Sequence, residues 1–181
     1  MVSHVGNEQD VNKIGIDVMK RALPKGETVS SFLRAINETV SSRSTLQDWT
    51  PINLLNMMQL TETELNFFTP ELDSTIAIKY IFLLWTLKEA YTKALGLGLG
   101  FDFKRIEYDI PHGRVSVDGR PADGWEFLVF VIHTQEGTDT YQGAVARWVG
   151  GEETHFESIS NIKDDSRICL KELKDLMEGG T

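Results

Sequence analysis

The stretch that most constrains the fold is the segment around residues 70–95. Its apolar residues recur at close to helical spacing, at Ile78, Ile81, Phe82, Trp85, Ala90, Ala94 and Leu95. Thr69, Pro70 and Glu71 form a start signal, because a capping hydroxyl precedes a proline and an acid of the first turn. Gly96 is a stop signal, since a left-handed cap favours a residue without Cβ. The sequence therefore predicts one long helix over residues 70–95.

The second half of this helix carries a charged stripe. Trp85, Glu89 and Lys93 follow one another at i, i+4 and i+8, so their side chains share one face. One interpretation is an ordinary exposed Glu-to-Lys pair, which is common and contributes about 0.3–0.5 kcal/mol. The other is that the acid and the base serve a reaction, and the spacing alone does not decide between the two.

A second motif lies upstream, over residues 14–19. Its apolar residues alternate with Gly15, Asp17 and Met19, which is the period of a strand. Asp17 and Met19 are therefore expected on the same face of that strand. The glycine-rich run at 96–100 is not a dinucleotide loop, because such a loop follows a strand and opens a helix. We interpret that run as a helix cap followed by a tight turn.

These motifs together resemble the signature of the 4'-phosphopantetheinyl transferase superfamily. Residues 85–93 read Trp-x-x-Lys-Glu-Ala-x-x-Lys and run into Ala-Leu-Gly-Leu-Gly-Leu-Gly-Phe. The strand at 14–20 is similar to the family's Gly-x-Asp strand, and Val2-Ser3-His4 resembles its Asn-x-Ser-His element. The continuation at 100–109 resembles the eukaryotic branch, which includes the aminoadipate-semialdehyde-dehydrogenase transferases and the fungal lysine-pathway enzymes.

The resemblance implies an activity. The protein would transfer 4'-phosphopantetheine from coenzyme A to a serine of a carrier-protein domain, with Mg²⁺ as cofactor. That carrier would serve lysine biosynthesis through aminoadipate, or polyketide, fatty-acid or nonribosomal synthesis. Asp17 and Glu89 are the implied metal ligands, and Glu89 and Lys93 are the implied catalytic residues. His4, Lys88 and Lys93 are the implied contacts of coenzyme A.

One position departs from the pattern of many relatives. Two residues after Asp17 these relatives have a second acid, whereas this chain has Met19. A thioether is a poor ligand for a hard cation, so we expect water to take that place. Because Mg²⁺ commonly keeps several waters, the loss of one carboxylate is compatible with a metal site.

Beyond the long helix the sequence predicts mostly strands. They are expected over 101–110, 114–117, 125–133 and 141–149, with the last two paired as an antiparallel hairpin. Shorter helices are expected near 30–40, 52–60 and 168–177. The predicted fold class is α+β, with a mostly antiparallel sheet packed on the long helix.

We divide the chain into a remnant of the first lobe at 1–13, a transferase domain at 14–150, and a polar C-terminal extension with a short helix at 151–181. The larger family members have two similar lobes with coenzyme A between them. Three alternatives follow: a short enzyme that self-associates, an incomplete or alternatively spliced product, and an inert relative that only binds coenzyme A or a carrier protein. The intact charged motifs favour the enzyme.

Composition narrows the partners. A net charge of −9 argues against broad nucleic-acid binding, which needs a basic face. Lys20, Arg21 and Lys25 form a local basic group that fits an acidic carrier protein, or else an ordinary solvated loop. The single cysteine, Cys169, fits a reducing compartment, and we expect a cytoplasmic protein. No apolar run reaches about 18 residues, so no membrane span or secretion signal is predicted.

Overall fold

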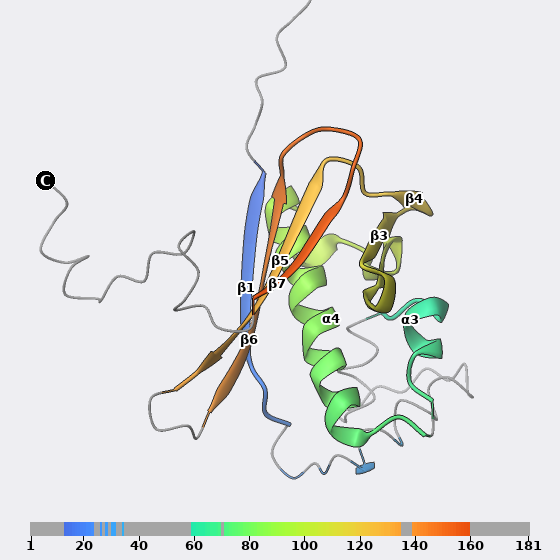
Figure 1. Ribbon diagram of the computed structural model, residues 1–181, viewed down its shortest axis with the longest axis vertical. Helices are drawn as coiled ribbons and strands as arrows, with labels where there is room; N and C mark the ends of the chain where they lie inside the picture. The colour runs from blue at the N-terminus through green and yellow to red at the C-terminus, as the bar shows by residue number, and fades with distance from the viewer. Residues whose placement is uncertain are drawn as a thin grey trace, which may run out of the picture.

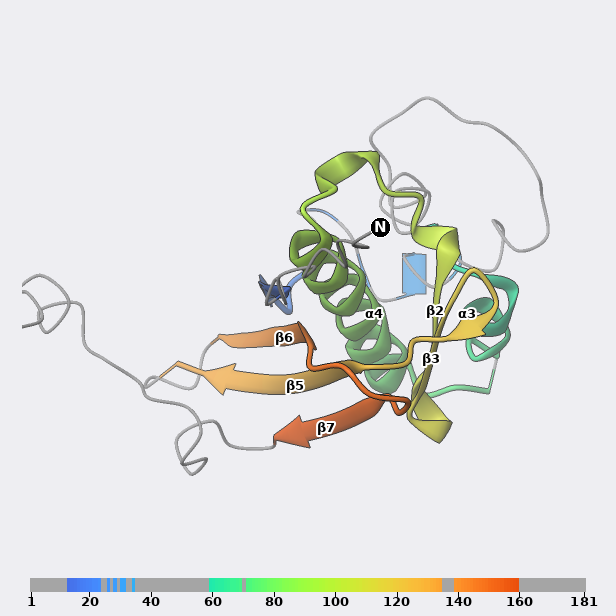
Figure 2. The same cartoon turned by 90° about the horizontal axis from the view of Figure 1, so that it is seen from above.

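A computed structural model of the 181-residue chain describes residues 13–23, 26, 28, 30, 31, 34, 59–69, 71–134 and 139–159. The long helix α4 (Ser74–Leu95) lies between two groups of elements. A four-stranded sheet covers one flank, and α3 (Glu62–Asn66) with a three-stranded sheet covers the other (Figures 1 and 2). The predicted α+β fold, with a sheet packed on the long helix, is confirmed.

The four-stranded sheet has the order β1-β6-β5-β7. Its strands are β1 (Ile14–Lys20), β5 (Trp125–His133), β6 (Thr140–Trp148) and β7 (His155–Ile159). β6 pairs antiparallel with both β1 and β5, whereas β7 pairs parallel with β5. The predicted β1 strand and the β5–β6 hairpin are confirmed, with β6 beginning one residue earlier than expected.

Strand β7 is a correction to the sequence analysis, which assigned everything from residue 151 to a polar extension. Phe156 turns inward, half-buried against the core, and lies opposite Phe127 of β5. His155, its neighbour, is exposed. A short edge strand with one inward aromatic gives almost no alternating signal, so the sequence pattern did not reveal it. The helix expected at 168–177 lies outside the described residues.

The smaller sheet has the order β2-β3-β4. Its strands are β2 (Ile106–Asp109), β3 (Arg114–Val117) and β4 (Arg120–Pro121). The strand expected over 101–110 was wrong in its first half, which contains the 3₁₀ helix η2 (Phe103–Arg105). Another 3₁₀ helix, η1 (Gly98–Gly100), precedes it, where a tight turn was expected after the Gly96 cap. A further 3₁₀ helix, η3 (Ile110–His112), makes the predicted turn between β2 and β3.

Helix α4 ends where it was predicted to end but begins later. Gly96 is left-handed with φ 69°, and its N–H donates to the carbonyl of Lys93 at 3.1 Å. The predicted start at Thr69 was wrong. Asp73 caps the helix instead, because its carboxylate accepts hydrogen bonds from the backbone N–H groups of Thr75 and Ile76 at 2.9 and 3.2 Å.

The core fills both flanks of α4. Ile81, Leu84 and Leu87 are buried on the helix, and the Tyr91 ring packs 4.7 Å from that of Trp125, measured between centroids. Helix α3 begins with a capping box between Thr61 and Glu64. The helices expected near 30–40 and 52–60 fall almost entirely outside the described residues. Within the described part, no helix is long and apolar enough to cross a membrane.

Candidate functional site

The candidate site lies where β1 crosses the C-terminal half of α4. The backbone of Gly15 packs directly against the backbone of the helix. A Cβ placed on Gly15 would lie 2.1 Å from the Ala90 carbonyl oxygen and 2.3 Å from the Ala94 nitrogen. Fully buried Ala146, opposite Gly15 on β6, keeps this face of the sheet flat. Small residues on both sides therefore let the strand lie directly on the helix.

This contact brings the two predicted motifs together. Asp17 lies two residues beyond Gly15 on the same face of β1 and reaches the charged stripe of α4. The Lys93 ammonium donates to an Asp17 carboxylate oxygen at 2.6 Å. The Asp17 side chain is 14 % exposed and that of Lys93 48 %, so the pair borders solvent.

Glu89 belongs to the same group of charges. Its side chain is half-buried, and burial raises its pKa. The negative charge of Asp17 raises that pKa further, while Lys93 lowers it. The structure therefore places Asp17, Glu89 and Lys93 within electrostatic reach of one another, as two carboxylates and one ammonium.

The donor set suits a hard cation. The two carboxylates, one from a strand and one from a helix, would supply the oxygen ligands that a hard cation such as Mg²⁺ prefers. Repulsion between the two carboxylates is the kind of charge imbalance that a divalent cation relieves. Among the described residues, no three or more His, Cys, Asp or Glu side chains lie close enough together to hold a metal ion. Half-buried Met19 follows Asp17 on the same face.

Lys88 lies apart from the other predicted site residues. Its side chain is 0 % exposed, and its ammonium lies 2.8 Å from the equally buried carboxylate of Glu64. The ammonium also donates to the backbone carbonyls of Phe103 and Ile106. The structure does not present Lys88 from the helix edge beside Glu89, so its expected phosphate contact stays a prediction without geometric support.

The remaining predictions have mixed outcomes. Trp85 packs half-buried against the core, in keeping with a role in fixing the helix. In the proposed basic group, Lys20 pairs with Asp139 at 2.7 Å and the Arg21 guanidinium donates to the Gln142 side chain. His4 and Lys25 lie outside the described residues.

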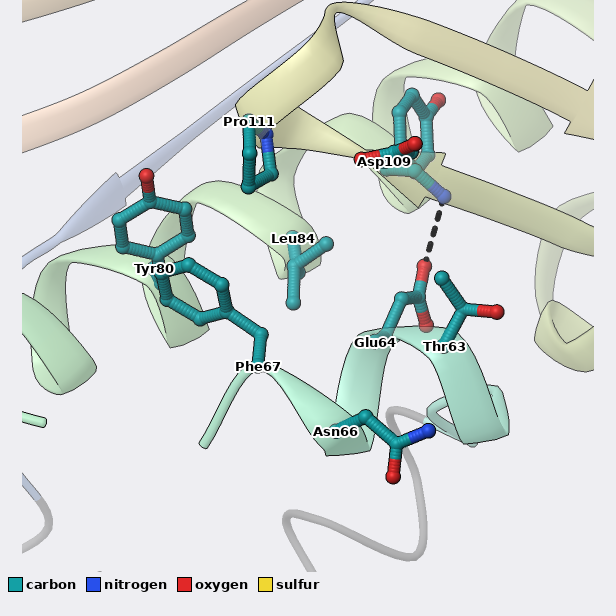
Figure 3. A pocket seen from close by; sticks show the side chains of 9 residues that line it. Thr63, Glu64, Asn66, Phe67, Tyr80, Leu84, Asp109 and Pro111 are labelled. Carbon is teal, nitrogen blue, oxygen red and sulfur yellow. Dashed lines mark hydrogen bonds between the residues drawn. The ribbon is translucent and has the colours of Figure 1, made fainter. Parts of the chain in front are cut away.

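A separate pocket of about 210 Å³ lies on the flank of α4 that faces α3 and β2 (Figure 3). Phe67, Tyr80, Leu84 and Pro111 give it an apolar lining. Since Asp17, Glu89 and Lys93 do not line it, this pocket is distinct from the candidate site.

Two residues that shape the site were not singled out as such by the sequence. Gly15 was noted only as part of a motif, although its missing Cβ is what admits α4. Glu64 was not singled out, although it neutralises Lys88 inside the protein. The capping-box spacing of Thr61 and Glu64 was a readable signal of the helix, but not of the partner of Lys88.

Comparison with known proteins identifies the family. The model of the 4'-phosphopantetheinyl transferase superfamily matches residues 13–146. A 4'-phosphopantetheinyl transferase, pptA, from Paxillus involutus is 36 % identical over 156 residues, which cover 86 % of this chain and 51 % of that protein. The chain therefore belongs to the 4'-phosphopantetheinyl transferase superfamily.

More distant relatives are vertebrate proteins. The L-aminoadipate-semialdehyde dehydrogenase-phosphopantetheinyl transferase of Xenopus laevis is 30 % identical over 115 residues, covering 60 % of this chain and 31 % of its own length. The human protein of the same name is 24 % identical over 126 residues, covering 64 % and 34 %. The expected likeness to the eukaryotic branch is confirmed. The chain spans about half the length of the fungal relative and a third of the vertebrate ones.

Proposed function

We propose that this protein transfers 4'-phosphopantetheine from coenzyme A to a serine hydroxyl of a carrier-protein domain. The observation that carries the proposal is the meeting of Asp17 on β1 with Glu89 and Lys93 on α4, in a chain of this family. Such a site combines oxygen ligands for a cation with an acid–base group and a mobile positive charge.

Asp17 and Glu89 are the residues that would hold Mg²⁺, with water at the place beside Met19. The bound ion would supply charge stabilisation for the pyrophosphate of coenzyme A. The Lys93 ammonium pairs with Asp17 at 2.6 Å. Its side chain is half exposed, so it is free to turn toward a phosphate.

The reaction assigns a task to each side chain. The serine oxygen attacks the pantetheine-bearing phosphorus, and the bond to the departing adenosine 3',5'-bisphosphate breaks. Glu89 takes the serine proton, directly or through a water, and its raised pKa favours that role at neutral pH. Lys93 stabilises the negative charge that collects on the phosphate oxygens.

The candidate acceptors are carrier domains of several classes. The names of the vertebrate relatives favour aminoadipate-semialdehyde dehydrogenase as the acceptor, which would link the protein to lysine biosynthesis. Acyl and peptidyl carriers of fatty-acid, polyketide or nonribosomal synthases are the alternatives. The reducing environment suited to the single cysteine, Cys169, supports a cytosolic location, which imaging of a tagged protein would test.

The deciding experiment is an intact-mass measurement of purified carrier domains after incubation with coenzyme A and Mg²⁺. A mass gain equal to one phosphopantetheine group is expected. Glu89→Gln keeps the shape of the side chain and removes its charge, so turnover should fall by about 100-fold or more. Glu62→Gln, at an exposed carboxylate of α3, is the matched control and should leave turnover unchanged.

The second candidate is an inert relative that only binds coenzyme A or a carrier protein. The observation in its favour is that the side chain of Lys88, an implied contact of coenzyme A, is buried against Glu64. Binding of coenzyme A without any mass gain on the carrier would establish this alternative. Near-normal turnover in Glu89→Gln would instead leave the enzyme in place and remove the role assigned to Glu89.

We further propose that the chain self-associates through the outer face of β1. Ile14, Ile16 and Val18 are 60 %, 54 % and 47 % exposed on the face that points away from α4. Val145 of β6 lies beside Ile16 in the register and extends this apolar surface. Contiguous apolar surface of this kind favours a protein partner, and a second copy of the chain supplies the same surface.

A further inference from the structure

A buried ion pair ties α4 to α3 on the flank opposite the candidate site. The side chains of Lys88 and Glu64 are both 0 % exposed, and the ammonium lies 2.8 Å from the carboxylate. Burial lowers the pKa of Lys88 and raises that of Glu64. In both cases the charge of the partner shifts the pKa the other way, but by less. A pair in this position carries a large desolvation cost, so stability alone is a weak reason for its presence.

The ammonium is surrounded by acceptors. Besides the Glu64 carboxylate, it donates to the carbonyl of Phe103 at 2.9 Å and to that of Ile106 at 3.1 Å, and the carbonyl of Gln59 lies at 3.5 Å. The three shorter contacts come from three segments: α3, η2 and β2. Their directions fix the end of the Lys88 side chain in three dimensions.

The carboxylate of Glu64 is equally occupied. One oxygen accepts from the Thr61 backbone N–H at 2.9 Å. The other accepts from the Tyr108 backbone N–H at 3.0 Å, the bond dashed in Figure 3. The Tyr108 hydroxyl in turn donates to the carbonyl of Leu87 at 3.1 Å, one residue before Lys88. Two adjoining residues of α4 are therefore fastened to the same strand.

The residue after Lys88 is Glu89. Neighbouring side chains on a helix diverge by about 100°, so fixing the direction of Lys88 also fixes that of Glu89. On the opposite flank, β1 meets α4 through Gly15, Ala90 and Ala94. This contact sets how closely β1 lies on α4, and on the other flank the same turn of the helix is held by the hydrogen bonds of Leu87 and Lys88.

We propose that Lys88 and Glu64 are positioning residues: their buried ion pair sets the rotation of α4 about its axis and thereby turns Glu89 toward Asp17. This inference rests on the proposed function for the role of Glu89. In this proposal Lys88 acts inside the protein and does not contact the phosphates of coenzyme A. Buried networks of this kind specify one arrangement where apolar packing tolerates several.

The test replaces the pair without leaving a buried charge. In Glu64→Gln/Lys88→Met both charges disappear together, a change that folded proteins commonly tolerate. Ile81→Val is the matched control, because it trims a buried residue of α4 by one methylene, a loss that typically costs about 0.5–1.5 kcal/mol, and leaves the pair intact. Denaturant unfolding confirms that each variant is folded.

Two readouts follow, neither of which needs turnover. The first is the affinity for Mn²⁺, a paramagnetic substitute for Mg²⁺, measured by electron paramagnetic resonance without coenzyme A. The second, in metal-free protein, is the set of nuclear Overhauser effects between the Gly15 methylene protons and the methyl groups of Ala90 and Ala94. In the double variant we expect an affinity loss of about 10- to 100-fold and a changed set of these contacts. The control should match the wild type in both.

Unchanged Mn²⁺ affinity and unchanged contacts in a folded double variant would overturn the proposal. Should the double variant not fold, Glu64→Asp alone decides by the same readouts, since it keeps both charges and shortens only the side chain that places the carboxylate. A wild-type protein whose Mn²⁺ affinity is untouched by Asp17→Asn would contradict the metal site, and with it the proposed function. The Gly15 contacts would then decide the positioning role by themselves.

Discussion

At the scale of single residues, Gly15 has the most demanding position. Its absent Cβ is the space that the backbone of α4 occupies at Ala90 and Ala94. Glycine is required here for close approach rather than for an unusual φ, so the motif position reports a packing constraint. The approach of Asp17 to α4 depends on this contact.

We expect Gly15→Ala to lower the free energy of unfolding by about 1–3 kcal/mol, because the added methyl group meets helix backbone that cannot turn aside. It should also weaken Mn²⁺ binding, since β1 must lift Asp17 away from Glu89. Denaturant titration and electron paramagnetic resonance measure the two effects. Gly100→Ala is the control, because a Cβ there meets nothing within 4 Å; equal behaviour of the two variants would contradict the close approach.

Glu89 sets a pH dependence whose sign follows from its surroundings. Burial, and then the charge of Asp17, raise its pKa above the ordinary 4.5. Protons compete with a metal for the carboxylate, so metal affinity is full above the raised pKa and falls as the pH drops through it. We expect the Mn²⁺ affinity to begin falling at a pH above 4.5. An affinity that stays constant down to pH 4.5 would contradict the assignment of Glu89 as a ligand.

The metal-free protein should show the opposite sign. A group whose pKa is raised on folding stabilises the folded state below its unfolded pKa, and that contribution is lost as the pH rises through the folded value. Glu89 therefore costs the ion-free protein stability at neutral pH. This cost is typical of a residue that is placed for chemistry.

At the scale of elements, two residues near the N-terminus of α4, Thr69 and Asp73, are both suitable as the N-cap. The sequence has an acceptable signal at Thr69, yet the carboxylate of Asp73 takes the role. Both residue types are good caps, and Thr69 is engaged through its backbone carbonyl, which accepts from the N–H of Leu72 at 3.1 Å. A turn before the helix therefore moved the start by several residues.

Removing the cap should be measurable. We expect Asp73→Ala to lower the free energy of unfolding by about 1 kcal/mol, because the N–H groups of Thr75 and Ile76 lose their acceptor. Thermal or denaturant unfolding gives the value. Thr69→Ala, at an exposed residue outside the helix, is the matched control and should change the free energy of unfolding far less. A larger loss in Thr69→Ala than in Asp73→Ala would show that Thr69 is the N-cap.

The elements also differ in how well the sequence predicted them. β5 alternates well enough that both of its ends were predicted correctly, and β3 was bounded by turn residues on each side. β7 has one inward aromatic and pairs with a strand distant in the sequence, so local periodicity carried no sign of it. The 3₁₀ turn at Phe103–Arg105 was predicted as a strand because Phe101 and Phe103 are two residues apart, the spacing of one face of a strand.

At the scale of the whole molecule, the apolar outer face of β1 predicts concentration-dependent self-association. Sedimentation velocity over a range of concentrations should show a species larger than the monomer. We expect Ile16→Lys to abolish that species, because a charge would be buried between two copies. Ile76→Lys, at an isoleucine that is 42 % exposed on the first turn of α4, is the control.

Two outcomes would contradict this prediction. A chain that sediments as a monomer at every concentration has no self-association to explain. Loss of the larger species in both lysine variants would point to a general effect of charge rather than to the face of β1.

The sequence by itself determined the long helix, the Asp17 strand and the family, because helical period, strand period and motif spacing are local properties of the chain. It also identified Glu89 and Lys93 as one stripe, since residues four apart on a helix share a face. It could not decide between an exposed pair and a site.

Only the tertiary structure decided where neighbouring side chains of this helix lie. Lys88 and Glu89 are adjacent in sequence, yet Lys88 is fully buried against Glu64, whereas Glu89 is half-buried within electrostatic reach of Asp17. Their directions depend on which distant segments pack on each flank of α4, and spacing along one helix contains no information about those partners. The close fit of Gly15 on the helix backbone, which brings Asp17 to the stripe, is likewise a relation between two distant segments.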